Sequence, residues 1–259
     1  PDVVVLALPW SDEQRIEQCL RAFMNLPVRV ELAPERVLDR FKAPRIARLG
    51  SALTLNVLRP PLGHTGRAAK RLFDIVIALV ALILLAPLFL VVALLIRLDS
   101  PGPVLFRQTR YGFNQEPFRI WKFRSMRTMD DGPVVRQAAR DDARITRIGR
   151  FIRKWNIDEL PQLINVLTGD MSLVGPRPHA VAHNRQYEGR IDLYARRHNV
   201  LPGITGWAQV HGLRGATDDI AMQKRVEYDL YYLDNWSFGL DIAILFMTVF
   251  SRRSYRNAY

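Results

Sequence analysis

The sequence predicts an α+β domain that associates with a membrane through a re-entrant helical hairpin and is preceded by the end of an α/β domain. Three observations lead to this prediction. An uncharged apolar run of 22 residues covers positions 75–96. A polar, arginine-rich segment with short strand-like stretches follows that run. Before it, a strand, a helix and a second strand succeed one another through short connections.

The first 58 residues predict a single strand-helix-strand unit. Residues 3–8 form an apolar strand, residues 11–25 a helix with Ser11 as its N-cap, and residues 28–32 an alternating strand. One such unit cannot close a sheet alone. We therefore expect residues 1–58 to be the C-terminal part of a domain that begins elsewhere in a longer protein. A glycine-rich phosphate loop does not follow the first strand, so a dinucleotide-binding role has no support.

A linker over residues 59–69, rich in Pro and Gly, leads into the membrane segment, residues 70–98. Its 22 uncharged residues would make a helix of roughly 33 Å, which is long enough to cross a bilayer. However, Pro87 lies near the middle and disrupts a helix. Basic residues, including Arg71 and Arg97, also flank both ends, whereas a spanning segment carries its positive excess on one side. We therefore predict a hairpin that breaks at Pro87 and returns to the same membrane face.

Charge and composition narrow the classes of protein. The chain has 37 basic and 25 acidic residues, a net charge of +12 and one cysteine, which excludes a disulfide framework. An apolar content of 49% excludes wholesale disorder. Residues 97–154 hold fourteen basic residues against six acidic ones. Nucleic acid, anionic lipid or a phosphate-rich substrate would each suit that charge. Because the basic stretch directly follows the membrane segment, lipid and substrate are favoured, and we expect no nucleic-acid partner.

Residues 99–259 predict the α+β domain itself. Residues 104–106 and 118–123 form the strands of a hairpin that turns around Gly112. Further along, residues 222–236 form an aromatic, amphipathic stretch. Residues 240–249 are apolar but too short to span a bilayer, so they predict a core helix or an interfacial helix.

Two adjacent acids begin the most informative segment. Residues 156–169 predict a helix that ends at Gly169, and Asp158 and Glu159 lie at its start. Acids at this position commonly cap free backbone N–H groups, which is the simpler interpretation. The chemical interpretation is a carboxylate nucleophile beside a carboxylate that binds a hard cation such as Mg²⁺. We expect nearby arginines to favour the ionised form of both acids.

Two proline- and glycine-rich segments complete the candidate site. Residues 174–178 hold Arg177 between two prolines, which suits either an exposed loop arginine or a phosphate clamp. Residues 202–212 combine a glycine-rich turn with an aromatic residue and an amide, and alone they predict no more than a turn.

Taken together and in order, these segments resemble the bacterial sugar transferases, the monotopic phosphoglycosyl transferases. The resemblance extends from about residue 67 to the C-terminus. Residues 178–184 and 256–259 further resemble the undecaprenyl-phosphate glucose phosphotransferase branch. Residues 1–58 resemble the end of the Rossmann-like domain that precedes the catalytic domain in large members. The five motifs are Lys70-Arg71-Leu72-Phe73-Asp74, residues 118–125, residues 158–163, residues 169–178 and residues 202–210.

The resemblance implies a reaction and roles for particular residues. A hexose 1-phosphate, most simply glucose 1-phosphate, would pass from a UDP-sugar to undecaprenyl phosphate with release of UMP. Asp158 would be the nucleophile and Glu159 would be linked to Mg²⁺. Lys122, Arg153 and Arg177 would bind substrate phosphates.

The resemblance also implies a location, the cytoplasmic face of the bacterial inner membrane, where UDP-sugars are found. It implies the first membrane step of exopolysaccharide or capsule assembly. The sequence leaves open a homo-oligomer, a galactose 1-phosphate transferase, and a basic membrane-anchored binding protein without enzymatic activity. The last alternative accounts for the charge and the apolar run but not for the acidic pair or the Pro-Arg-Pro loop.

Overall fold

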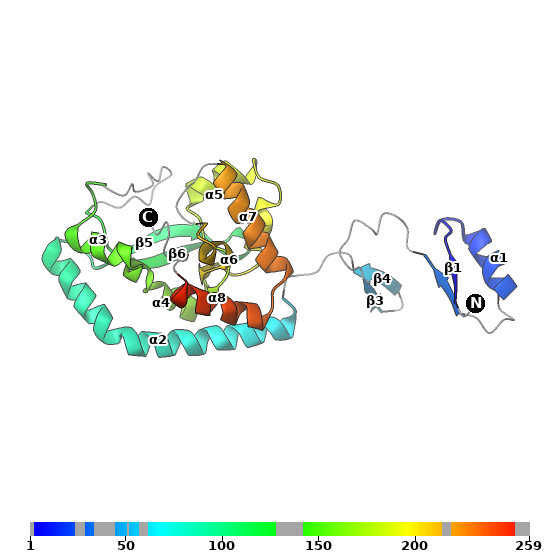
Figure 1. Ribbon diagram of the computed structural model, residues 1–259, viewed down its shortest axis with the longest axis horizontal. Coiled ribbons are helices and arrows are strands. Elements are labelled where there is room, and N and C mark those ends of the chain that lie inside the picture. The colour runs from blue at the N-terminus through cyan, green and yellow to red at the C-terminus, as the bar shows by residue number, and fades with distance from the viewer. Residues whose placement is uncertain are drawn as a thin grey trace. The chain divides into compact units, whose positions relative to one another are not determined.

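The computed structural model describes residues 3–23, 29–33, 45–50, 52–56, 62–127, 142–213 and 219–251 (Figure 1). The chain divides into two units, Pro1–Pro60 and Pro61–Tyr259. The first part of the predicted linker and the C-terminal motif at residues 256–259 lie outside the described residues.

The first unit contains the strand-helix-strand motif that the sequence predicts. Strand β1 (Val3–Leu6) is followed by helix α1 (Glu13–Phe23) and strand β2 (Arg29–Leu32). The two strands pair in parallel, with Val3 opposite Arg29. An antiparallel pair that the sequence did not predict follows, formed by β3 (Arg45–Leu49) and β4 (Ala52–Asn56).

The second unit begins with one long helix, α2 (His64–Asp99), where the sequence predicted a linker and then a hairpin of two helices. The helix starts inside the predicted linker, and Pro87 lies within it. Figure 1 shows that α2 is straight over its first part and bends in its second half. A proline removes one backbone hydrogen bond and crowds the preceding turn, which bends a helix. The break predicted at Pro87 is therefore a bend within a continuous helix.

Helix α2 exposes most of its apolar side chains. Within the described ranges it is the single helix that is long and apolar enough to cross a membrane, and only 11% of its most apolar stretch is buried. Leu84 and Leu98 are both 74% exposed. Phe246 and Phe250 of helix α8 (Phe238–Phe250) are also exposed. An apolar surface of this extent is typical of contact with lipid or a partner, and it is unlike the buried core helix of a soluble domain.

The arginine-rich segment forms the predicted hairpin. Strands β5 (Leu105–Tyr111) and β6 (Pro117–Phe123) pair antiparallel, and the short helix η2 (Phe113–Gln115) lies at their tip. Ile120 and Phe123 of β6 are buried in two different hydrophobic clusters. The hairpin thereby connects two of the three hydrophobic clusters in the described part of the chain.

Short helices and strands follow the hairpin and surround the candidate site. In chain order these are α3 (Arg147–Lys154), η3 (Ile157–Glu159), α4 (Gln162–Thr168), β7 (Ser172–Val174), α5 (Val181–Glu188), η4 (Tyr194–Asn199), β8 (Gly203–Thr205), α6 (Trp207–Val210), α7 (Asp219–Asp234) and α8. The helix predicted over 156–169 is thus two elements, η3 and α4. Its predicted end is correct, because Gly169 closes α4 in the left-handed conformation with a φ of 97°.

Both halves of α2 pack against the rest of the second unit, to which the helix belongs. Ala78, in the first half, belongs to a cluster with Val166 of α4 and Ile244 of α8. Val92 and Ile96, in the second half, belong to a cluster with Ile152 of α3 and with β6. Figure 1 shows α2 running along one side of this unit, next to α4 and α8.

Candidate active site

Glu159 is held by two cations from separate elements. Lys122 of β6 donates to its Oε1 atom over 2.7 Å. Arg177, in the loop after β7, makes a two-pronged ion pair, with Nη1 2.8 Å from Oε2 and Nη2 2.5 Å from Oε1. Burial favours the neutral acid, but Arg177 and Lys122 outweigh it and lower the pKa of Glu159 well below its ordinary value. Glu159 is therefore ionised at neutral pH.

Asp158, the neighbouring acid, has a different environment. Its carboxylate accepts no hydrogen bond from any residue that the structure describes, although the residue is only 8% exposed. Burial and the charge of Glu159 raise its pKa to about 6, and Lys122, Arg153 and Arg177 oppose that rise. The cations favour the ionised form of Asp158, as predicted, but burial and the adjacent carboxylate have the larger effect on its pKa. A pKa of about 6 still leaves Asp158 mostly ionised at neutral pH.

Neither acid caps a helix. Helix η3 and helix α4 both begin without a side-chain cap, and Glu159 is turned toward Lys122 and Arg177. Asn156, which precedes η3, has a left-handed backbone with a φ of 55°. The capping interpretation of the acidic pair is therefore wrong, because cationic side chains rather than backbone N–H groups surround Glu159.

The Pro-Arg-Pro loop packs against the glycine-rich segment 202–212, for which the sequence predicted only a turn. Strand β7 pairs in parallel with β8, and Gly203 N–H donates to the Pro176 carbonyl over 2.9 Å. A Cβ atom added to Gly203 would lie 2.1 Å from the nitrogen of Gly175. A Cβ atom on Gly206 would lie 2.2 Å from the Gly175 oxygen. The two segments are glycine-rich because their backbones approach too closely for side chains, and this contact fixes the position of Arg177.

Arg153 lies near Asp158 without pairing with it. It is in the last turn of α3, and its Nη1 atom is 3.8 Å from the sulfur of Met126. Its charge lowers the pKa of Asp158. Of the five predicted site residues, four therefore form one contiguous cluster, and Arg153 acts on it through its field. The cluster is formed by Asp158, Glu159, Lys122 and Arg177.

The same cluster determines how a metal ion could be held. Within the described residues there is no group of three or more His, Cys, Asp and Glu side chains suited to a metal ion. Mg²⁺ is commonly bound by one or two carboxylates, with substrate phosphates and water completing its shell. Glu159 fits that arrangement as a single carboxylate ligand, and a metal cage made only of protein groups does not. Glu159 would exchange part of its contact with Lys122 or Arg177 for the ion.

A buried polar network behind the Pro-Arg-Pro loop was not predicted from the sequence. Arg197 of η4 pairs with Asp229 of α7 over 2.7 Å, and their side chains are 1% and 2% exposed. Arg197 also donates to the backbone carbonyl of Arg177 over 2.7 Å. The partners are 32 residues apart in the chain and share no motif, so spacing alone could not have identified them.

Comparison with known proteins gives the family. The model of the family described as bacterial sugar transferase matches residues 65–253. Over 257 residues the chain is 45% identical to a UDP-glucose:undecaprenyl-phosphate glucose-1-phosphate transferase of Escherichia coli (strain K12), covering 99% of the chain and 55% of that protein. It is 54% identical over 187 residues to the exopolysaccharide production protein PSS of Rhizobium leguminosarum bv. phaseoli, covering 70% and 94%.

A third relative carries a different sugar in its name. The chain is 48% identical over 181 residues to a UDP-N-acetylgalactosamine-undecaprenyl-phosphate N-acetylgalactosaminephosphotransferase of Aeromonas hydrophila, covering 70% of the chain and 42% of that protein. The chain thus spans about half the length of the E. coli and Aeromonas proteins. The family match covers most of the chain, including the acidic pair and the Pro-Arg-Pro loop. The chain belongs to the bacterial sugar transferase family.

Proposed function

We propose that this protein transfers a hexose 1-phosphate, glucose 1-phosphate in the first instance, from a UDP-sugar to undecaprenyl phosphate and releases UMP. The observation that supports this most strongly is the unequal environment of the two acids. Two cations hold Glu159, while Asp158 is buried beside them without a hydrogen-bond partner in the described chain. The name of the E. coli relative supports the same donor and acceptor.

In the first half-reaction, Asp158 attacks the phosphorus that carries the sugar. A bond forms between a carboxylate oxygen and that phosphorus, and the bond from the phosphorus to the bridging oxygen breaks. UMP leaves with the electron pair, and the enzyme holds the phosphosugar on Asp158 as an acyl phosphate. In the second half-reaction, a phosphate oxygen of undecaprenyl phosphate attacks the same phosphorus. The bond between the Asp158 oxygen and the phosphorus breaks, the carboxylate is regenerated, and the kinetics are ping-pong.

The cations around the acids suit a diphosphate substrate. Lys122 and Arg177 would neutralise the phosphoryl oxygens and the departing UMP, and the field of Arg153 would favour the ionised nucleophile. Bound Mg²⁺ would supply further charge neutralisation of the diphosphate, with Glu159 among its ligands. Asp158 then needs no general base, because it is mostly ionised at neutral pH with a pKa of about 6.

A re-entrant position of α2 in the membrane agrees with its contacts. Near the start of the helix, Lys70 pairs with Asp241 of α8 over 2.6 Å. At the end of the helix, Arg124 donates to the Ser100 carbonyl over 2.5 Å, and Ile148 N–H of α3 donates to Asp99 over 3.2 Å. One globular unit cannot lie on both sides of a bilayer. The two ends of α2 therefore belong on the same face, which we assign to the cytoplasmic side of the bacterial inner membrane because UDP-sugars are cytoplasmic.

The proposal also covers the domain type of the first unit and the biosynthetic step that the reaction serves. The parallel pair β1 and β2, joined by α1, supports our assignment of residues 1–58 to the end of a Rossmann-like domain. The Rhizobium relative, named for exopolysaccharide production, supports a role at the first membrane step of exopolysaccharide or capsule assembly. A galactose 1-phosphate transferase is the alternative within the family, because the charged side chains of the cluster suit phosphate groups and do not distinguish one hexose from another.

The direct test is UMP release from a panel of UDP-sugars with undecaprenyl phosphate as acceptor. We expect UDP-glucose to be the preferred donor. A preference for UDP-galactose would show that the protein is a galactose 1-phosphate transferase. Asp158→Asn and Glu159→Gln should each abolish turnover, whereas Asp234→Asn, which alters a surface ion pair with Arg196, should leave it unchanged. Binding of anionic vesicles without UMP release from any donor would instead favour a membrane-anchored binding protein.

A further inference from the structure

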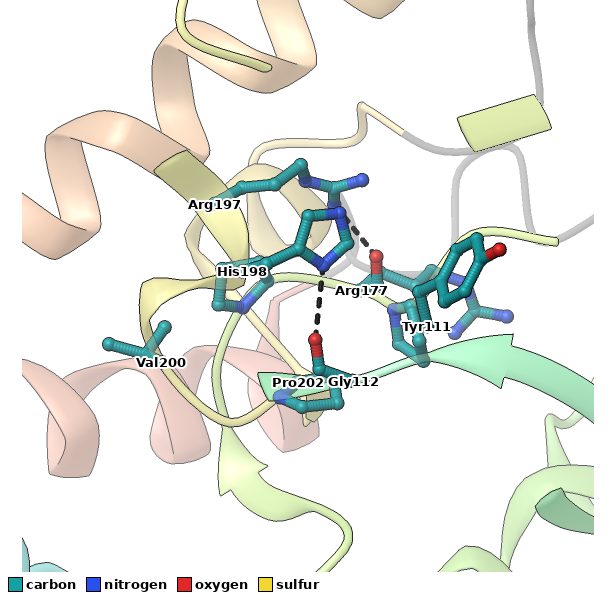
Figure 2. Close-up of a pocket in the computed structure, with 9 residues that line it drawn as sticks. Tyr111, Gly112, Arg177, Arg197, His198, Val200 and Pro202 are labelled. Carbon is teal, nitrogen blue, oxygen red and sulfur yellow. Dashed lines mark hydrogen bonds between the residues drawn. The ribbon is translucent and has the colours of Figure 1, made fainter. Parts of the chain in front are cut away.

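Helix η4 bonds to both elements that supply the cations around Glu159. Arg177 is in the loop after β7, and Lys122 is on the β5–β6 hairpin. Two consecutive residues of η4, Arg197 and His198, bond to these two elements. Figure 2 shows both bonds beside a small pocket that the Pro-Arg-Pro loop and the end of β5 line together.

Arg197 binds the Pro-Arg-Pro loop directly. Its Nη2 atom donates to the backbone carbonyl of Arg177 over 2.7 Å and to Asp229 Oδ2 over 2.7 Å. Arg197 and Asp229 are almost completely buried, so water does not compete for either bond. The pair therefore connects the backbone of the phosphate-binding loop to helix α7.

His198 binds the tip of the hairpin. Its Nδ1 atom lies 3.2 Å from the Gly112 carbonyl, and its Nε2 atom lies 3.2 Å from the amide nitrogen of Asn184. A carbonyl only accepts, so the ring donates from Nδ1 and accepts at Nε2, as a neutral imidazole does. Burial, together with the charge of Arg197, lowers the pKa of His198 to about 4, which keeps the ring neutral.

We propose that Arg197 and His198 are positioning residues that fix the distance between the Arg177 loop and the β5–β6 hairpin, and so hold Glu159 between its two cations. Arg197 donates directly to the backbone carbonyl of Arg177, whose side chain pairs with Glu159. His198 acts at the hairpin tip, where Gly112 lies six positions after Phe106, the residue of β5 paired with Lys122. Loss of the Arg197 bond should therefore impair the site more than loss of the His198 bond. The catalytic consequence rests on the proposed function, whereas the positioning itself does not.

The first test measures positioning without substrate, by hydrogen exchange in the full chain in lipid nanodiscs. Arg197→Lys keeps the charge opposite Asp229 but shortens the reach, and we expect amide exchange in residues 175–180 to be roughly tenfold faster. His198→Leu should accelerate exchange in residues 111–117. In His198→Asn the side chain can still donate to the Gly112 carbonyl, so exchange in residues 111–117 should stay slow. The matched control is Arg196→Met, on the same helix but in the surface pair with Asp234.

The second test measures UMP release by the same variants. Arg197→Lys should lower kcat by about 10- to 100-fold, because small displacements of charged groups have effects of that size. His198→Leu should lower kcat less, and His198→Asn should restore most of it, while KM for the UDP-sugar changes less than about threefold. All assays are run well below the thermal unfolding temperature of each variant, because loss of a buried hydrogen bond also lowers stability.

Exchange equal to that of Arg196→Met in both segments would overturn the proposal. Equal loss of kcat in His198→Asn and His198→Leu would also overturn it, because the bond to Gly112 would then be irrelevant. Absence of UMP release from the unmodified protein would overturn the proposed function, and the exchange measurement would still decide whether Arg197 and His198 hold the two elements.

Discussion

Asp158 and Glu159 are adjacent in the chain, yet their surroundings give them different chemistry. Glu159 accepts three hydrogen bonds from Lys122 and Arg177, which keep it ionised and fixed. Asp158 keeps its lone pairs unused among the described residues, and its pKa is raised to about 6. The less constrained carboxylate of Asp158 is the one free to attack a substrate, in keeping with its proposed role as nucleophile.

The raised pKa of Asp158 predicts how the reaction depends on pH. The carboxylate must be ionised to attack, so the rate of UMP release should rise with pH through about 6 and level off above it. Arg153 lowers that pKa without contacting Glu159 in the described structure. Arg153→Met should therefore shift the acidic limb upward by roughly 0.5–1 pH unit. The measurement is UMP release against pH for both proteins, and an unshifted limb would contradict this role of Arg153.

Asn156 predicts a stability effect from backbone conformation alone. Its φ of 55° lies in the left-handed region, which Asn and Gly tolerate and β-branched residues do not. Asn156→Val should lower the free energy of unfolding by about 1–2 kcal/mol. Asn156→Gly, its control, should change it by less than about 0.5 kcal/mol. Thermal unfolding in detergent compares the three proteins, and equal stability of the Val and Gly variants would contradict the left-handed assignment.

At the scale of elements, a buried ion pair fixes α2 to the rest of its unit. Lys70 and Asp241 have side chains that are 10% and 0% exposed, and Asp241 also accepts from Tyr232 over 2.7 Å and from Trp236 over 3.2 Å. Lys70→Met leaves Asp241 buried without its counter-charge and should destabilise the protein by about 3–5 kcal/mol. Adding Asp241→Asn should recover part of that loss. Thermal unfolding of the two variants measures it, and no recovery would contradict the pairing.

The contacts of α2 also predict its membrane topology. Thr65 and Pro101 lie at opposite ends of the helix and are exposed. In a protein with Cys19→Ser, single cysteines at these two positions should react with an impermeant reagent from the same side of sealed vesicles. Ser100 is unsuitable for labelling because it is buried against Arg124. Labelling of the two positions from opposite sides would show that α2 spans the bilayer.

Some elements could be predicted from sequence because one local pattern determines each of them. The β5–β6 hairpin follows from alternation around Gly112, and the end of α4 follows from Gly169. The split between η3 and α4 falls at Leu160 and Pro161, and it was not predictable, because a proline suits the first turn of one continuous helix equally well. Continuity of α2 through Pro87 depends on packing of both helix halves against one unit, which spacing does not reveal.

The candidate site shows the same division. Asp158, Glu159, Arg177 and Lys122 belong to motifs that could be found by their residue types. Arg197 and its partner could not, because a long-range buried pair leaves no periodic trace in the sequence.

At the scale of the whole molecule, the proposal places one soluble substrate and one membrane substrate at a single acidic pair. The exposed apolar side chains of α2 and α8 lie on the unit that also carries the cationic cluster. A ping-pong reaction suits this geometry, because the soluble product UMP can leave before the lipid acceptor reacts with the phosphosugar held on Asp158.

The central claim is a covalent phosphosugar on Asp158, and it can be measured without the acceptor. Mixing the protein with UDP-glucose and Mg²⁺ alone should release UMP in a burst of about one equivalent per site. Intact mass spectrometry after acid quench should show an added hexose phosphate, located on the peptide that contains Asp158. Asp158→Asn should show neither signal. UMP release that requires undecaprenyl phosphate, with no adduct and no burst, would contradict the account.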